Sequence, residues 1–158
     1  MNGILTFLIR SVVVLLGYAV AALCSSAFLH VVSLPMLGFT AEETPAVVIG
    51  SVVFSIPFIA LFVAYFSFIP SLFAILAGEI IGLRDWLYYA IAGGVIGAVV
   101  MGYFRSATEA DQSLIGEPGF MFALIGAGMC GGLGYWLIAG RSAGGWRKPR
   151  EITSPEPK

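Results

Sequence analysis

Two ionisable residues, Arg10 and Glu79, lie inside long apolar stretches of the sequence. An ionisable group at membrane depth is costly to keep, so its position indicates what it does. Near the bilayer midplane, a carboxylate is typical of proton or ion transport. Near one edge of the bilayer, a carboxylate is explained by a basic residue that pairs with it. The chemistry open to Glu79 is therefore a proton site, an ion ligand or one half of an ion pair.

The depth of the two residues favours pairing. Arg10 lies six residues into the first apolar stretch, about 9 Å along a helix, and Glu79 lies five residues before Arg84, about 7.5 Å. Both depths are shallow and on the same side of a bilayer. A long arginine reaches the headgroups unaided, but the shorter glutamate does not. We therefore predict an ion pair between Arg10 and Glu79. A pair between Glu79 and Arg84 is the competing prediction, although five residues is a poor same-face spacing.

The remaining reactive side chains form no catalytic or metal-binding pattern. The single histidine, His30, has no carboxylate or cysteine at a useful spacing. Cys24 and Cys130 lie in apolar stretches without a CxxC motif. The sequence has no HExxH or GxSxG motif and no carboxylate pair on a helix face. We expect no enzyme activity, no cofactor and no metal site, and we expect both cysteines to act as small hydrophobic residues.

The composition indicates which elements position Arg10 and Glu79. Hydrophobic residues are 59% of the 158 residues and charged residues 11%, whereas soluble domains carry about a quarter charged residues. About 20 apolar residues in a helix cross the roughly 30 Å hydrocarbon core. Four such spans are predicted, at about 4–32, 46–66, 86–104 and 119–140. The predicted fold is an all-α polytopic membrane protein, without a basic surface for nucleic acid.

Basic residues predict the orientation of the spans. Five of them follow Gly140, whereas the segment between the first two spans has none and carries Glu42 and Glu43. Because Lys and Arg concentrate on the cytoplasmic side, both termini are expected in the cytoplasm. The basic segment 141–158 is predicted to be a disordered tail, and residues 1–140 the transmembrane domain. The first span lacks a basic leading segment and is expected to stay uncleaved.

The apolar stretch that contains Glu79 is too long for one span. Residues 46–83 would form a straight helix of roughly 57 Å, which no plausible tilt accommodates. Pro70 lacks a backbone donor and disfavours helix at the residue before it. We predict that the crossing helix ends near Phe66 and that a second helical piece covers about 70–83. That piece is either a kinked continuation or a shallow re-entrant helix, and Pro57 is another expected kink.

Small residues recur at helical spacing along the predicted spans. In lipid, such stripes let two helix backbones approach closely. Glycines lining a conduit are the alternative interpretation. We predict helix-packing roles for Gly78, Gly82, Gly93, Gly97, Gly128, Gly131 and Gly132.

The chain broadly resembles small bacterial inner-membrane proteins, a likeness that implies a location in the inner (plasma) membrane and no activity. The leading hypothesis is a non-enzymatic membrane protein that acts through helix–helix packing. It would be an accessory or assembly subunit of a membrane complex, or a homo-oligomer. The alternative is a small transporter or channel component for protons, cations or a small solute. The expected partners are the lipid bilayer and either other membrane subunits or a second copy.

Overall fold

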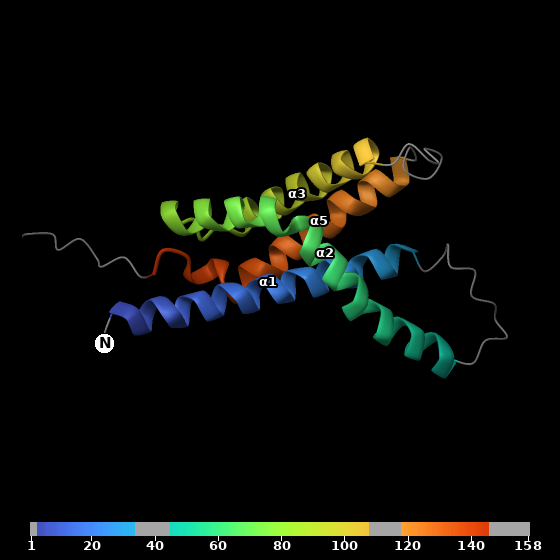
Figure 1. Ribbon diagram of the computed structural model, residues 1–158, viewed down its shortest axis with the longest axis horizontal. Helices are drawn as coiled ribbons and strands as arrows, with labels where there is room; N and C mark the ends of the chain where they lie inside the picture. Colours follow the sequence, from blue (N-terminus) through green and yellow to red (C-terminus); the bar gives the residue numbers. More distant parts are fainter. Residues whose placement is uncertain (1–2, 34–44, 108–117, 146–158) are drawn as a thin grey trace, which may run out of the picture.

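Four long helices run up and down in an antiparallel bundle (Figure 1). The computed structural model describes residues 3–33, 45–107 and 118–145. The helices are α1 (Gly3–Ser33), α2 (Pro45–Ile81), α3 (Trp86–Ala107) and α5 (Pro118–Ile138), and the short 3₁₀ helix η2 (Gly140–Ser142) follows α5. Each long helix is apolar and long enough to cross a membrane. The prediction of an all-α fold with four such helices is confirmed for the described residues.

Local sequence signals account for several helix ends. α2 and α5 begin at Pro45 and Pro118, where the missing N–H has no helical partner to lose. α3 begins after Asp85, whose Oδ1 accepts a hydrogen bond of 3.1 Å from the backbone N–H of Leu87. That bond satisfies one of the free donors at the helix start.

α2 differs from the prediction. It is one helix of 37 residues that runs through Pro57 and Pro70, so the predicted break between Phe66 and Pro70 is wrong. Figure 1 shows a bend in its place, and the segment 70–81 is a kinked continuation and not a separate re-entrant helix. Proline is tolerated inside an apolar helix when neighbouring hydroxyl groups bond to nearby carbonyl groups. On α1, Tyr18 and Ser26 donate to two α2 carbonyl oxygens, although not to those of Val53 and Phe66, which the prolines leave without a helical donor.

The carbonyl oxygens that accept these bonds lie close to the two prolines. The Tyr18 hydroxyl donates to the carbonyl oxygen of Ala64, and the Ser26 hydroxyl donates to that of Ile56 at 2.7 Å. On α2 itself, Ser67 donates back to the carbonyl oxygen of Val63 at 2.6 Å. The bonds from Tyr18 and Ser26 join α2 to α1.

The four helices are packed unequally. The most extensive contacts are between α3 and α5, followed by those between α1 and α5. α2 contacts α1 less extensively and α3 least of these pairs. The buried cluster of Tyr89, Tyr135 and Ala139 lies where α3 begins and α5 ends. α1, α3 and α5 therefore form the compact part of the bundle, and α2 lies across it.

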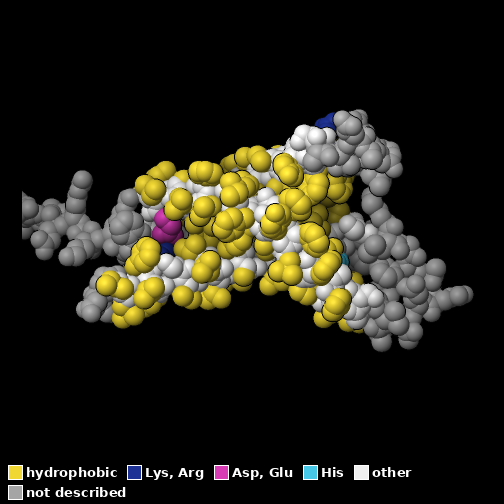
Figure 2. Space-filling view, viewed as in Figure 1, with side chains coloured by type: hydrophobic (Ala, Val, Ile, Leu, Met, Phe, Trp, Pro, Cys, Tyr) yellow, Lys and Arg dark blue, Asp and Glu magenta, His cyan; other side chains and the backbone are white. Residues whose placement is uncertain are grey.

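The outer surface of the bundle is apolar. Figure 2 shows one face on which hydrophobic side chains predominate, with charged groups near its ends. Large side chains on three different helices, Phe7, Phe54 and Phe122, are more than half exposed. This distribution suits helices whose surroundings are hydrocarbon, because the backbone polar groups are satisfied within each helix.

Candidate functional site

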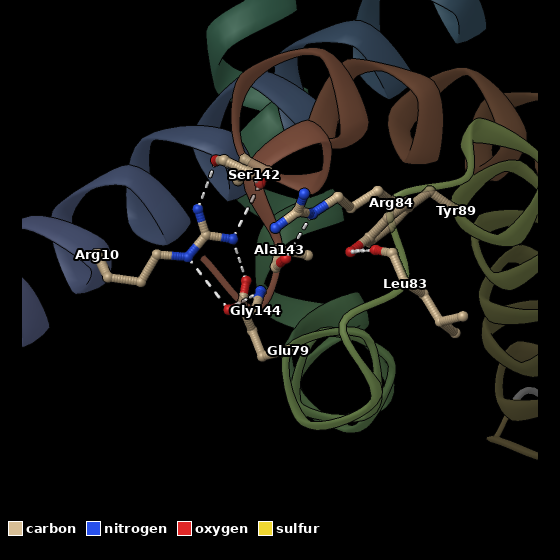
Figure 3. A network of polar contacts seen from close by, with 9 residues as sticks. Arg10, Glu79, Leu83, Arg84, Tyr89, Ser142, Ala143 and Gly144 are labelled. Carbon is tan, nitrogen blue, oxygen red and sulfur yellow. Dashed lines mark hydrogen bonds and ion pairs between the residues drawn. The ribbon is translucent and has the colours of Figure 1, made fainter. Parts of the chain in front are cut away.

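Arg10 and Glu79 form an ion pair at the end of the bundle where α1 begins and α2 ends (Figure 3). The guanidinium Nε donates to Oε2 of Glu79 at 3.1 Å, and Nη2 donates to Oε1. The two side chains are only 14% and 12% exposed. The structure thus brings the two predicted residues together, with two parallel hydrogen bonds that match the planar guanidinium to the carboxylate.

The segment 139–144, which follows α5, completes this network (Figure 3). Nη1 of Arg10 donates to Oγ of Ser142 at 2.7 Å, and Nη2 donates to the carbonyl oxygen of Ala139 at 3.0 Å. The backbone N–H of Gly144 donates to Oε2 of Glu79 at 3.3 Å. We call Arg10, Glu79 and the segment 139–144 the polar clasp.

Arg84, the competing partner in the sequence prediction, bonds elsewhere. Its Nε donates to the carbonyl oxygen of Ala143 at 3.0 Å. Its own carbonyl oxygen accepts a bond of 2.8 Å from the indole Nε1 of Trp136. Arg84 therefore bonds to the segment after α5, and Glu79 pairs with Arg10 instead.

Two glycines with positive φ allow the backbone to turn sharply beside the clasp. Gly82 has φ 77° and Gly144 φ 68°, a region that favours glycine. A Cβ at Gly144 would lie 2.9 Å from the Cα of Gly82, so the two backbones touch here. The N–H of Leu83 bonds to the carbonyl oxygen of Gly78 at 3.0 Å, which ends α2 in a Schellman-type turn.

Gly82 therefore differs from its predicted helix-packing role. A Cβ on Gly82 would meet nothing within 4 Å. The residue is a glycine because the turn that ends α2 needs a positive φ there. The stripe at helical spacing was misleading because α2 ends at Ile81, one residue earlier.

The start of the predicted disordered tail also needs correction. Residues 141–145 are described and fold back onto the bundle, with Ala143 completely buried. The clasp and Arg84 supply the bonds that hold them. A tail beginning at 141 is therefore wrong for residues 141–145, and residues 146–158 lie outside the described part of the chain.

The chemistry of the clasp is that of a saturated ion pair. Both carboxylate oxygens of Glu79 accept a bond from Arg10, and Oε2 accepts another from Gly144. Each nitrogen of the Arg10 guanidinium donates at least once. A buried pair of this kind is worth keeping only with good geometry and additional hydrogen bonds, and both are present. The clasp therefore fixes the ends of α1, α2 and α5 relative to one another.

The predicted packing glycines lie mainly between α3 and α5. A Cβ on Gly93 would overlap the carbonyl group of Gly128, and a Cβ on Gly128 would overlap that of Gly93. The two backbones therefore touch directly, as expected for small residues at a helix–helix contact. Four others also have no room for a Cβ: Gly97 against Leu124, Gly132 against Tyr89, Gly131 against Ser25, and Gly78 against the hydroxyl of Tyr89.

His30 has a structural role that its isolation in the sequence did not reveal. It is 7% exposed, with Nδ1 2.8 Å from the carbonyl oxygen of Ser26 and Nε2 2.6 Å from Oγ of Ser55. The carbonyl only accepts, so Nδ1 carries a proton, and the imidazole links α1 to α2. The available signal was the spacing of Tyr18, Ser26 and His30, eight and four residues apart, which places all three on one face of α1.

A cavity of about 490 Å³ lies between the four long helices. Each helix presents one face to it, and none of the lining residues is charged. Its walls combine aliphatic and aromatic side chains with the small residues of α1, α3 and α5. Cavities of this size commonly hold small molecules. It is the second candidate site in the described part of the chain.

The described residues contain no group of three or more His, Cys, Asp or Glu that could hold a metal ion. Cys24 and Cys130 are free and half-buried, and a Cβ on Gly134 would lie 2.9 Å from the Cys24 sulfur. No protein-family model, curated protein or solved structure matches the chain. The functional argument therefore depends on the clasp, the cavity and the outer surface.

Proposed function

We propose that this protein is a non-enzymatic integral membrane protein of the bacterial inner (plasma) membrane, which acts by packing against an additional transmembrane helix. The observation that carries the proposal is an exposed apolar stripe on α2. Phe54, Leu61 and Tyr65 are 79%, 70% and 78% exposed. Their spacing of seven and four residues places them on one face of the helix. The helix that covers this stripe belongs to another membrane subunit or to a second copy.

The use of the glycines within the bundle supports this choice of surface. Gly93, Gly97, Gly128 and Gly132 already contact backbone atoms of the same chain, so they are not free to build a contact between copies. α2 is the least covered long helix. In its most apolar stretch of 18 residues 6% is buried, whereas the corresponding fraction for α3 is 33%. An interface with another helix therefore has its largest available surface on α2.

The charges at the ends of the helices support an orientation with both termini in the cytoplasm. Arg10, Arg84 and Arg141 belong to the end of the bundle that holds the clasp, and Arg105 lies in the last turn of α3, at the opposite end. Basic residues near span ends concentrate on the cytoplasmic side. The clasp end is therefore proposed to face the cytoplasm.

The mass of the assembly in native lipid tests the proposal. Membranes are extracted into polymer-bounded nanodiscs, and native mass spectrometry measures the mass of the protein assembly. We expect a complex larger than one 16.7 kDa chain. Replacing Phe54, Leu61 and Tyr65 by alanine should release the single chain. The matched control replaces three exposed apolar residues on α1, Ile4, Phe7 and Leu15, and should leave the complex intact.

The masses found also separate the two kinds of partner. A multiple of the chain mass identifies a homo-oligomer, and an added mass of another kind identifies a different subunit. A single chain in nanodiscs of the unaltered protein contradicts the proposal. So does a complex that survives the α2 substitutions but not the α1 substitutions.

A small transporter or channel component is the second candidate, and the observation that favours it is the central cavity. Its uncharged lining suits an apolar solute better than protons or cations. Flux across proteoliposomes tests this candidate. Proton- or cation-driven flux that is lost in Glu79→Gln would replace helix packing as the leading function.

A further inference from the structure

Two arginines at the clasp end of the bundle form no ion pair within the described part of the chain. Arg84 and Arg141 are both exposed, and the ion pair found among the described residues joins Arg10 to Glu79. The acid next to Arg84 is Asp85, whose Oδ1 accepts a hydrogen bond from the backbone at the start of α3. Because the charges of the clasp balance, the described residues of this surface carry one more positive charge than negative.

Trp136 links these two arginines. Its indole Nε1 donates to the carbonyl oxygen of Arg84 at 2.8 Å, and the guanidinium carbon of Arg141 lies over its ring, 5.6 Å from the centroid. The guanidinium of Arg84 is held by its Nε, which donates to the carbonyl oxygen of Ala143, two residues after Arg141 (Figure 3). Both guanidinium groups are therefore positioned by the protein and keep further N–H donors. We call Arg84, Trp136 and Arg141 the arginine–tryptophan patch.

An exposed apolar face of α5 continues from Trp136 into the span. Leu133, Met129 and Phe122 are 36%, 42% and 67% exposed. From Trp136 they follow at intervals of three, four and seven residues, so all four side chains lie on one face of the helix. The stretch from Trp136 to Phe122 covers roughly 21 Å along the helix axis. A basic patch at one end of a long apolar surface matches the two parts of a phospholipid.

We propose that the arginine–tryptophan patch binds the headgroup of an anionic phospholipid, whose acyl chains lie along α5 toward Phe122. Guanidinium groups match phosphate oxygens with paired N–H donors, and basic pockets between transmembrane helices bind anionic headgroups. An anionic lipid balances the excess positive charge, whereas a zwitterionic lipid brings a second cation to it. The indole of Trp136 has the position typical of tryptophan at the end of a span, where its ring lies among the headgroups.

Native mass spectrometry of the full chain measures the lipid preference. The protein is purified in detergent and titrated with phosphatidylglycerol or with phosphatidylcholine that has the same acyl chains. We expect phosphatidylglycerol to bind roughly tenfold more tightly, because only its headgroup carries a net charge opposite to that of the patch. Equal affinities for the two lipids would overturn the proposal.

Substitutions that remove one charge locate the site. Arg141→Gln should lower the affinity for phosphatidylglycerol about fivefold, and Arg141→Gln combined with Arg84→Gln about 25-fold, as expected for about 1 kcal/mol per basic residue. Arg105→Gln is the matched control, because Arg105 is an exposed arginine in the last turn of α3, at the opposite end of the bundle. It should leave the affinity unchanged. An equal loss in Arg105→Gln and Arg141→Gln would overturn the assigned site.

The basic residues that follow the described part of the chain need their own control. Replacing Arg147, Lys148 and Arg150 by glutamine should leave the preference for phosphatidylglycerol in place. Loss of the preference in this variant, with none in Arg141→Gln, would overturn the proposal.

A competition experiment separates a lipid from a soluble phosphate compound. Excess glycerol 3-phosphate should not displace phosphatidylglycerol, because it lacks the chains that lie along α5. Displacement would assign the patch to a soluble phosphate compound and overturn the proposal. Each affinity is read on a single chain, so the result does not depend on the assembly proposed above.

The melting temperature shows whether the variants remain folded. Arg141→Gln should melt close to the unaltered protein, because the side chain of Arg141 is exposed and lies over Trp136. If the double variant does not fold, the comparison of Arg141→Gln with Arg105→Gln still decides the proposal.

Discussion

The contact between α3 and α5 differs in kind from the contact between α1 and α2. α3 and α5 meet backbone to backbone, with Gly93 against Gly128 and no side chain between them. α1 and α2 are joined by separate polar bonds, from Tyr18 to Ala64 and from Ser26 to Ile56. In lipid there is little hydrophobic drive between helices, so close van der Waals packing and hydrogen bonds are the available forces. In this bundle, close packing joins α3 to α5, and hydrogen bonds join α1 to α2.

The consequence of that difference is the cavity. Where glycines face one another, the helices leave no space for a side chain. Along α2, bulky residues such as Phe62 and Phe66 hold the helix away from the others, and the cavity lies in the gap. At one end of the bundle, the polar clasp joins the ends of α1, α2 and α5.

Replacing Gly93 by leucine should lower the stability of the protein most, because it disrupts the close backbone contact between α3 and α5. A side chain there would overlap the carbonyl group of Gly128, so α3 and α5 must move apart. We expect a loss of more than about 3 kcal/mol in the free energy of unfolding, or no folded protein. SDS denaturation followed by circular dichroism measures it. Gly102→Leu, on the same helix but with nothing within 4 Å of a Cβ, is the control. Equal stability of the two variants would show that the close contact is not the main source of stability.

Replacing Arg10 by methionine should have the next largest effect, because it opens the clasp. Glu79 would keep a mostly buried charge with only Gly144 as donor. Removing one partner of a buried pair typically costs about 3 to 5 kcal/mol. SDS denaturation of Arg10→Met, Glu79→Gln and the double variant measures the coupling energy. A double variant whose loss equals the sum of the single losses would mean that the two residues are not coupled.

An exchange of the two charges is expected to fail as a rescue. With glutamate at position 10, a carboxylate would face the carbonyl oxygen of Ala139, which only accepts. With arginine at position 79, a guanidinium would face the N–H of Gly144, which only donates. The segment 139–144 therefore makes the clasp directional, and full rescue by the exchange would contradict the observed bonds.

Replacing Tyr18 by phenylalanine should lower the stability least. It tests how much the hydrogen bonds between α1 and α2 contribute. The change removes the bond to Ala64 and the 3.3 Å contact with Ser67 while the ring stays. Hydrogen bonds between helices in membranes average about 0.6 kcal/mol, so a loss of about 1 kcal/mol or less is expected. Chemical denaturation with Tyr65→Phe as the exposed control measures it. A loss near that of Gly93→Leu would show that single polar bonds hold α2 as firmly as glycine packing holds α5.

Several features could be predicted because they depend on short stretches of sequence. The four long helices follow from runs of about 20 apolar residues. The pairing of Arg10 with Glu79 followed from their opposite charges and similar shallow depths, both of which can be read along the chain. Gly93 and Gly128 were recognisable as packing residues because helical spacing places small residues on one face.

Other features were decided by the tertiary structure. Ser142 and Arg10 are 132 residues apart, and nothing local to either indicates that they meet. α2 continues as one helix through Pro57 and Pro70, whereas a rule about proline alone predicts a break. The helices themselves were determined by local hydropathy and backbone geometry. The clasp, the partner of His30 and the cavity exist only where helices dock, because docking depends on shape and hydrogen bonds between residues that are distant along the chain.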